Sequence, residues 1–277
     1  MPNPSILVMK IREAEEYIRA RTKVRPKVGL VLGTGLGDFD DRDLDIAFRI
    51  PFGDIPHFPV TAVESHAGEM LLAKFHGHDT VIFRGRIHGY EGYRFREVAF
   101  PVRVMKALGV ETVILTNAVG GMNPAYKPGT IMIVTDHINL TGDNPLIGPN
   151  DDELGPRFPD MSEPYDRKLI ALAEQVAAEK KVPVEKGVFV GVMGPNLETA
   201  AEYRFLRMIG ADVVGMSLIA EDIAAIHGSQ KVLAFSVVTD MCLPDELKPA
   251  SIPEILKVAG RTAPKLMSLV AGILEQL

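Results

Sequence analysis

The sequence contains one cysteine, no tryptophan and no long apolar run. The single Cys242 excludes an internal disulfide framework and any metal site built from several cysteines. No stretch approaches the roughly 18 consecutive apolar residues of a membrane-spanning helix. An excess of basic residues is also missing, since 30 Lys and Arg against 36 Asp and Glu give a formal net charge of −6. That balance disfavours a general nucleic-acid-binding surface. We therefore expect a soluble protein of the cytoplasm with no nucleic-acid or membrane partner.

A chain of 277 residues, 47% of them hydrophobic, is long enough to bury one large core. No low-complexity linker, internal repeat or break in composition divides it, so we expect one domain over residues 1–277. We expect strands over residues 27–32, 70–75, 80–83, 112–115, 131–134, 188–192, 213–215 and 232–238. We expect helices over residues 5–21, 95–108, 167–180, 198–208, 218–226 and 252–274. Strands and helices alternate after an early hairpin, which indicates an α/β fold with a mixed central sheet surrounded by helices.

A glycine-rich segment follows the first expected strand. Gly33, Gly35 and Gly37 flank Thr34 there. Glycines allow backbone N–H groups to approach an anion, and the threonine hydroxyl adds a donor. A dinucleotide-binding fingerprint needs glycine or alanine where Asp38 stands, so a dinucleotide-dependent oxidoreductase is disfavoured. A tight turn without a ligand is the plainer alternative.

Two more segments at strand ends carry groups suited to phosphate and sugar. Residues 84–93 (RGRIHGYEGY) hold two arginines, a histidine and two tyrosines, which suit recognition of phosphate and sugar hydroxyls. The alternative is a solvated loop whose aromatic rings pack locally. Residues 117–121 (NAVGG) open a stretch with glycine and proline, 117–129, which we expect to be a loop with backbone donors for an anion.

Three polar residues mark a fourth place. Glu198, Ser217 and Asp240 each stand at or just beyond an apolar strand. Because α/β proteins bind ligands at strand ends, we expect the three to converge on one pocket. Two carboxylates there can accept N–H groups of a base, or one can stay protonated and act as an acid. The alternative for Glu198 is that it merely starts a helix, whose dipole stabilises a carboxylate.

Other chemistries fit the sequence less well. Ser217 does not stand in Gly-x-Ser-x-Gly, so a hydrolase nucleophile elbow is not supported. His76 and His78 stand at the tip of the expected hairpin with no further metal ligand at a helpful spacing. Cys242 has no neighbouring base pattern and is expected to pack. We predict no metal site.

Taken in order, seven segments resemble the trimeric branch of the purine nucleoside phosphorylase and methylthioadenosine phosphorylase family, with purine nucleoside phosphorylases the nearest. The segments are VLGTGLGD, FPVTAVESHAG, FRGRIHGYEGY, LTNAVGGMNP, NPLIGPNDDELGPRFPDMSEPYD, GVMGPNLETAAEYR and GADVVGMSLIAED. The resemblance runs from about Lys27 to the C-terminal helix and implies the nucleoside phosphorylase fold, whose sheet is partly barrel-like. It also implies reversible phosphorolysis, in which a purine (deoxy)ribonucleoside and inorganic phosphate give free base and (deoxy)ribose 1-phosphate without a metal or organic cofactor.

The resemblance also implies roles for individual residues. The implied phosphate-binding residues are Thr34, His66, Arg86, His88, Ala118 (through its backbone) and Ser217. The implied ribose-binding residues are Tyr90, Met216 and Ile252. The implied base-binding residues are Ala118, Leu197, Glu198, Val214 and Asp240. Of all these, His88, Glu198 and Asp240 are the expected catalytic residues. Phe158 matches an aromatic residue that a neighbouring subunit lends to the pocket, which implies a homotrimer with shared sites.

Two positions depart from the phosphorylase pattern. Asp240 stands where guanosine- and inosine-cleaving members carry asparagine, and Ile252 replaces a histidine that contacts the ribose 5′-hydroxyl. Both changes favour methylthioadenosine phosphorylases, whereas Glu198 belongs to the purine nucleoside phosphorylase form of the base motif. We therefore expect a purine nucleoside phosphorylase that favours 6-oxopurines, with a 5′-methylthioadenosine phosphorylase as the alternative. A non-catalytic nucleoside-binding protein is the alternative from another class.

Overall fold

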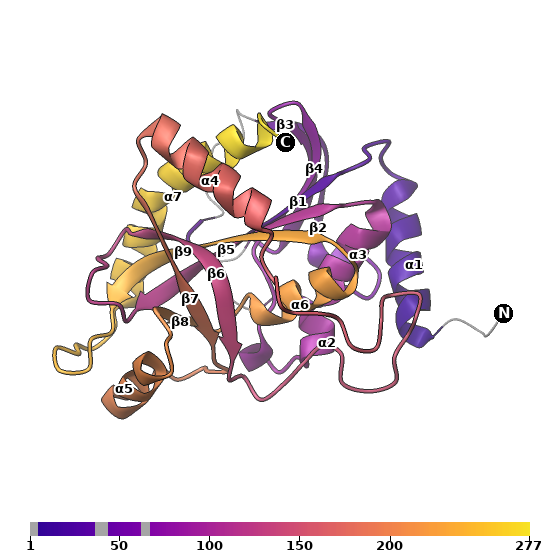
Figure 1. Cartoon of the computed structure of the whole chain (residues 1–277). Helices are drawn as coiled ribbons and strands as arrows, with labels where there is room; N and C mark the ends of the chain where they lie inside the picture. Colours follow the sequence, from indigo (N-terminus) through magenta and orange to yellow (C-terminus); the bar gives the residue numbers. More distant parts are fainter. Residues whose placement is uncertain (1–4, 37–43, 62–66) are drawn as a thin grey trace.

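The centre of the fold is one mixed β-sheet that curls at one end into a partial barrel (Figure 1). The computed structural model describes residues 5–36, 44–61 and 67–277. The strands within these residues are β1 (Val28–Leu32), β2 (Leu44–Pro51), β3 (Glu69–Phe75), β4 (His78–Arg84), β5 (Thr112–Gly121), β6 (Ile131–Asn139), β7 (Val184–Gly191), β8 (Val213–Gly215) and β9 (Lys231–Met241). Their order is β2-β3-β4-β1-β5-β8-β7-β6-β9, and β9 also pairs with β5, which closes a five-stranded ring. The predicted mixed, partly barrel-like sheet of one α/β domain is confirmed.

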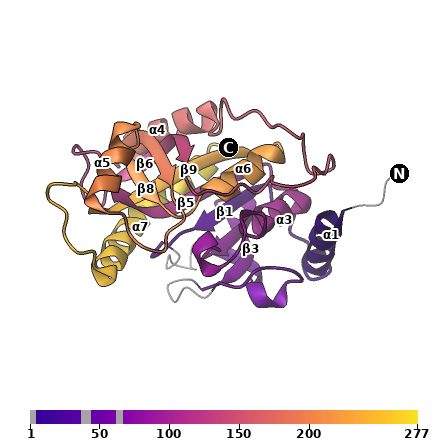
Figure 2. The same cartoon turned by 90° about the horizontal axis from the view of Figure 1, so that it is seen from below.

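Helices cover both faces of the sheet. They are α1 (Ile6–Arg19), α2 (Phe95–Val98), α3 (Phe100–Leu108), α4 (Arg167–Lys180), α5 (Ala200–Met208), α6 (Ile219–His227) and α7 (Ile252–Leu274). Helices α1, α3 and α6 gather on one side, and α4 packs on α7 on the other (Figures 1 and 2). Strand β1 shows why both faces are needed: Val31 joins the core under α3, and Leu30, pointing the other way, joins the core under α7.

The helix predicted over residues 95–108 is two helices. The chain ends α2 at Val98 and starts α3 at Phe100, with Pro101 in the first turn of α3. Proline fits there because the first N–H groups of a helix have no partner within the helix, whereas in a helix interior it removes a hydrogen bond. Gly109, with φ of 101°, then ends α3 in the left-handed conformation.

The prediction of a loop from residue 117 is wrong for residues 117–121, which belong to β5. Gly120 and Gly121 pair with both β8 and β9. A side chain at Gly120 would place its Cβ 2.7 Å from the sulfur of Cys242, and one at Gly121 would place it 2.6 Å from Val238. These glycines therefore allow close packing inside the barrel and do not mark a turn.

Candidate active site

A cavity of about 170 Å³ lies where β1, β4, β5, β8 and β9 end. Its lining includes most of the residues singled out in the sequence: Thr34, Arg86, His88, Tyr90, Ala118, Leu197, Glu198, Val214, Met216, Ser217 and Asp240. It also includes residues that sequence reasoning gave no site role, among them Tyr203, Cys242 and Ile255. The expected convergence of Glu198, Ser217 and Asp240 on one pocket is therefore observed.

Arg86 lies buried at one end of this cavity and is fixed from behind. Its Nε donates to Glu221 Oε1 at 3.1 Å, its Nη2 lies 3.0 Å from Glu221 Oε2, and its Nη1 donates to the carbonyl of Thr116 at 2.5 Å. Gly33 makes room for this arrangement, since a Cβ there would lie 2.7 Å from the Thr116 carbonyl oxygen and 3.3 Å from Arg86 Nη1. A guanidinium carries five N–H groups, so these contacts leave donors for an oxyanion in the cavity.

His88 stands beside Arg86 and is fixed in the same way. Glu91 Oε1 accepts from the backbone N–H of His88 at 2.8 Å and lies 3.1 Å from His88 Nδ1. The imidazole stacks on the ring of Tyr90, with centroids 4.7 Å apart and an interplanar angle of 16°. Burial, with a further contribution from Glu91, raises the pKa of Tyr90 to about 12, so the phenol stays protonated and can donate.

Ser217 is aimed at the cavity by a strained turn. Residues Ser217, Leu218 and Ile219 form a γ-turn, in which Ile219 N–H donates to the Ser217 carbonyl at 2.8 Å and Leu218 has φ of 73°. The Leu218 N–H donates to Glu221 Oε2 at 3.1 Å, so the carboxylate that holds Arg86 also holds this turn. Asn117 Nδ2 donates to Ser217 Oγ at 3.3 Å, which leaves the hydroxyl proton for a ligand.

Glu198 lies at the other end of the cavity and does not start the helix expected at that position. Helix α5 begins at Ala200, and Thr199 caps it by accepting from the backbone N–H of Glu202. Glu202 completes a capping box by accepting from the Thr199 N–H at 2.7 Å. Because these two residues satisfy the helix terminus, the carboxylate of Glu198 remains for the cavity. Burial raises the pKa of Glu198.

Asp240 faces the same end because β9 carries a bulge. Val119 pairs with Val238 and Gly120 with Asp240, so Thr239 is an extra residue in β9. Successive strand residues normally point to opposite faces, and the bulge allows both Thr239 and Asp240 to line the cavity. Asp240 Oδ1 accepts from the Thr239 hydroxyl at 2.8 Å.

A cysteine and a tyrosine line the cavity beside the two carboxylates. Cys242 Sγ donates to Asp240 Oδ2 at 3.4 Å, and the buried Tyr203 lines the same cavity as Glu198. Burial raises the pKa of Cys242 to about 12, so its thiol stays protonated and acts as a donor. Cys242 therefore does more than pack.

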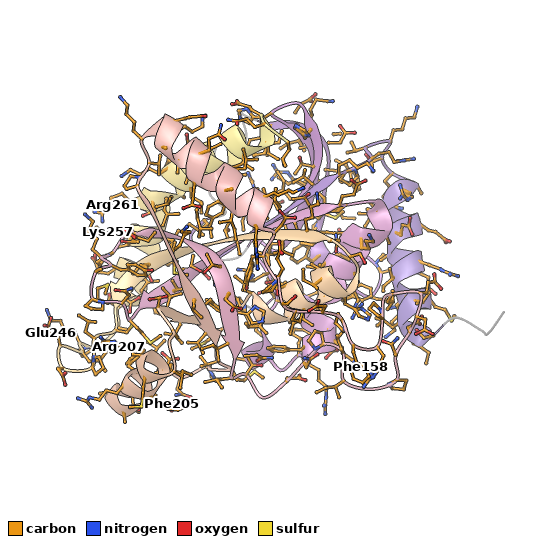
Figure 3. The ribbon with its side chains drawn as sticks, in the orientation of Figure 1. Phe158, Phe205, Arg207, Glu246, Lys257 and Arg261 are labelled. Atoms are coloured by element: carbon orange, nitrogen blue, oxygen red, sulfur yellow. The ribbon has the colours of Figure 1, made fainter. Side chains whose placement is uncertain are left out.

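Of the remaining expected residues, one lies outside the described part of the chain, one is replaced by a neighbour on the same helix, and one is expected in the pocket of another subunit. His66 lies outside the described residues. Ile252, the first residue of α7, is 61% exposed and does not line the cavity, whereas Ile255 on the next turn does. Ile255 lies about one turn further along α7, on nearly the same side of the helix as Ile252, and this second turn is the one that reaches the cavity. Phe158 is 86% exposed on the segment between β6 and α4, well away from Phe205 on α5 in Figure 3.

Two findings concern other kinds of site. Among residues 5–36, 44–61 and 67–277, no three His, Cys, Asp or Glu side chains cluster in a way that would hold a metal ion. In the same part of the chain, every helix is too short or too polar to cross a membrane.

The chain is similar to known proteins along nearly its whole length. Residues 27–275 match the phosphorylase superfamily. Purine nucleoside phosphorylase 1 of Bacillus subtilis is 45% identical over 96% of this chain and 98% of its own, and purine nucleoside phosphorylase of Rattus norvegicus is 40% identical over 95% and 93%. Crystal structures of Schistosoma purine nucleoside phosphorylase with hypoxanthine and of the Schistosoma mansoni enzyme with adenosine superpose with TM-scores of 0.90 and 0.89. Both are 38% identical, and each match covers 98% of both chains.

Proposed function

The chain belongs to the phosphorylase superfamily, and we propose that it is a purine nucleoside phosphorylase, a pentosyltransferase that exchanges the base of a purine nucleoside for inorganic phosphate. One observation of the structure carries this proposal: a single cavity has a fixed cation and hydroxyl donors at one end and two carboxylates at the other. The donors suit a phosphate, the carboxylates suit the N–H groups of a purine, and the space between them suits a ribose.

The reaction separates charge along the cavity. Cleavage of the glycosidic bond builds positive charge on the ribose and negative charge on the departing purine. Phosphate held by Arg86 and His88 serves as the nucleophile and as the counter-charge to the oxocarbenium-like sugar. Because these groups are already held in position, they stabilise the charges of the transition state without a reorganisation cost.

We assign the phosphate to Thr34, Arg86, His88, Ser217 and the backbone of Ala118. The family resemblance adds His66, which lies outside the described residues. Tyr90 and Met216 contact the ribose in this proposal, and Ile255 takes the place first expected of Ile252 because only Ile255 lines the cavity. The proposed chemistry is complete with phosphate as co-substrate and uses no metal or organic cofactor.

The base lies between Glu198 and Asp240, with Leu197, Val214 and Ala118 around it. An ionised Glu198 accepts from N1–H and a 2-amino group, which 6-oxopurines such as guanine offer. Asp240 accepts from a 6-amino group when ionised and donates to N7 or O6 when protonated. We therefore propose that 6-oxopurine nucleosides are favoured and that adenosine is also accepted.

A homotrimer completes the proposed site. Phe158 is exposed and lies outside the cavity of its own subunit, which supports a role in the pocket of the next one. We assign the reaction to purine salvage in the cytoplasm.

The test is base release from inosine, guanosine, adenosine and 5′-methylthioadenosine, each with and without inorganic phosphate. We expect phosphate-dependent release from the first three, fastest from the 6-oxopurine nucleosides. The apolar side chain of Ile255 and the acid at Asp240 favour the methylthioadenosine phosphorylase alternative, and release from methylthioadenosine alone would establish it. Tight nucleoside binding with no turnover on any of the four would identify a non-catalytic binding protein.

A further inference from the structure

A second cavity, of about 430 Å³, shares no residue with the first and lies where α1, α3 and the end of α6 meet residues 152–155. Figures 1 and 2 both show α1 beside α3, and α3 packs on α6. Its volume falls within the range of small-molecule sites, roughly 300–1,000 Å³.

A buried arginine without a carboxylate partner lines this cavity. Arg103 of α3 is only 6% exposed, and its Nη1 lies 3.3 Å from Nδ1 of His227. Its Nε has no hydrogen-bond partner, and within the described chain no carboxylate forms an ion pair with the guanidinium. Taking a cation out of water is costly unless an anion compensates for it, so this arrangement is incomplete as it stands.

The acidic side chains around the cavity are engaged elsewhere. Glu15 pairs with Arg19 at 2.6 Å, and Glu153 pairs with Arg12 at 2.5 Å. Asp152 accepts from the side-chain amide of Asn150 at 2.7 Å.

Asp151 is near enough to raise the pKa of Arg103, but its carboxylate accepts from the backbone N–H of Glu153 at 3.1 Å. Desolvation outweighs that contribution and lowers the pKa of Arg103 to about 10. The guanidinium remains charged at neutral pH, and no carboxylate of the described chain is paired with it.

Further donors stand around Arg103. Lys106, one turn along α3, and the exposed Ser229 line the same cavity. His227 accepts from Arg103 through Nδ1, so its proton lies on Nε2. Burial and the adjacent guanidinium lower the pKa of His227, which keeps the imidazole neutral and able to accept.

We propose that this cavity is a second ligand site, for a phosphate-type dianion that Arg103, Lys106 and Ser229 bind. The dianion is inorganic phosphate or the phosphate group of a sugar phosphate, since both present the same oxygens to a guanidinium. The ligand stabilises residues 151–155 against α6, where Gly155 already packs so closely that a Cβ would meet the His227 carbonyl oxygen at 2.0 Å. That segment leads directly to Phe158.

The location is tested with a heavy tetrahedral oxyanion. Crystals of the full chain are soaked in sodium tungstate, and the anomalous signal is mapped. We expect a tungstate peak within hydrogen-bond distance of the Arg103 guanidinium, inside the cavity. A cavity with no peak, or a carboxylate of residues 151–153 turned onto Arg103, would overturn the proposal.

Binding in solution is tested in an Arg86→Ala background, which separates this site from the proposed active site. The melting temperature is measured against inorganic phosphate and, in a parallel arm, ribose 5-phosphate, because a ligand that binds the native state raises Tm. We expect saturable stabilisation. Its half-saturating concentration should rise about tenfold or more with Arg103→Met, because the variant loses charge-assisted hydrogen bonds to the ligand. The arm with the lower half-saturating concentration identifies the ligand.

Two further variants keep the result interpretable. Arg261→Met, an exposed arginine of α7 labelled in Figure 3, removes a cation far from the cavity and should change nothing. Lys106→Ala, at an exposed position, should weaken binding several-fold even if Arg103→Met fails to fold. If phosphate raised Tm equally in the Arg86→Ala protein and in the same protein carrying Lys106→Ala or Arg103→Met, the proposal would be contradicted. This outcome does not depend on the result of the substrate panel.

Discussion

The two ends of the active-site cavity are built in opposite ways. At the phosphate end, the groups that face the ligand are a cation and an imidazole, and the carboxylates of Glu221 and Glu91 hold them from behind. At the base end the carboxylates face the ligand, and the protonated thiol of Cys242 donates to one of them, Asp240. The groups that face the ligand are therefore held by carboxylates at the phosphate end and by an uncharged donor at the base end.

The difference separates two properties of the enzyme. The phosphate end offers the same fixed donors whichever nucleoside is bound, because Glu221 ties Arg86 and the Ser217 turn to one helix. The base end carries titratable groups whose protonation depends on burial and on the donors nearby. We infer that the phosphate end determines how phosphate is used and that the base end determines which nucleoside is preferred. Variants at each end test this separation.

The largest effect is expected from Arg86→Met. Loss of the guanidinium removes the main phosphate donor, so kcat/KM for phosphate should fall about a hundredfold or more with every nucleoside alike. The free energy of unfolding should also fall by about 3–5 kcal/mol, because Glu221 is left buried and unpaired. Initial rates at varied phosphate and urea unfolding measure the two effects.

The double variant Arg86→Met/Glu221→Met is the matched control for stability. It removes both charges and should recover much of the lost unfolding free energy without recovering phosphate use. If the double variant regained activity, Arg86 would act through stability and not through phosphate.

Glu198→Gln should produce the next largest effect, and only at the base end. The amide presents donors where the purine N1–H needs an acceptor, so kcat/KM for guanosine should fall about a hundredfold through two lost hydrogen bonds to a charged group. The KM for phosphate should stay near that of the parent. Glu246→Gln, an exposed site labelled in Figure 3, is the control. A matching rise in the KM for phosphate would show that the two ends are not separable.

The same residue predicts a pH dependence. Burial raises the pKa of Glu198, and the ionised form is the one that accepts from the base. The value of kcat/KM for guanosine should therefore fall as pH decreases, with a midpoint above the pKa of about 4.3 of an ordinary glutamate. Glu198→Gln should abolish this acid limb while its low residual rate persists. An acid limb retained by the variant would assign it to another group.

Asp240→Asn should have a smaller effect that changes selectivity more than rate. The amide can donate to a 6-oxo group where an ionised carboxylate repels it, so the ratio of kcat/KM for inosine over adenosine should rise about tenfold, one hydrogen bond's worth. Asp245→Asn, an exposed aspartate paired with Arg204, should leave the ratio unchanged. An unaltered ratio in the Asp240 variant would show that this residue does not read the base.

The smallest expected effect comes from Cys242. Replacement by alanine removes the donor behind Asp240, and we expect a change of about threefold in the inosine-to-adenosine ratio, typical of a weak hydrogen bond. Cys242→Ser keeps a donor and should restore most of the parent ratio. If alanine and serine behaved alike, the thiol would contribute packing alone.

The sequence predicted most of the fold and of the cavity, because both rest on local patterns. Apolar runs located the strands, and glycines with polar residues at their ends located the ligand-facing segments. It did not predict that Asn117–Gly121 continues β5, since glycines that permit close packing of strands look the same in sequence as glycines that permit a turn. It also missed β2, an edge strand with partly exposed residues.

The supporting residues were missed for a related reason. Glu221 meets Arg86 across 135 positions of sequence, and only the fold brings them together. Some local signals existed. Glu221 is the third residue of α6, a position where a carboxylate often caps a helix, and Cys242 follows two residues after Asp240. Ile255 lines the cavity and Ile252 does not, and this depends on where α7 begins relative to the sheet. The hydrophobic periodicity of the sequence does not contain that information.

The bulge at Thr239 shifts the register of β9 against β5 by one residue. Before it, β9 alternates in step with β5 and builds the barrel wall, and after it the same alternation is displaced by one residue. Deleting Thr239 would remove the bulge and make Asp240 follow Val238 directly, so one polar side chain in place of two would line the cavity at this point. Recognition of the base thus depends on the length of this strand as well as on its composition.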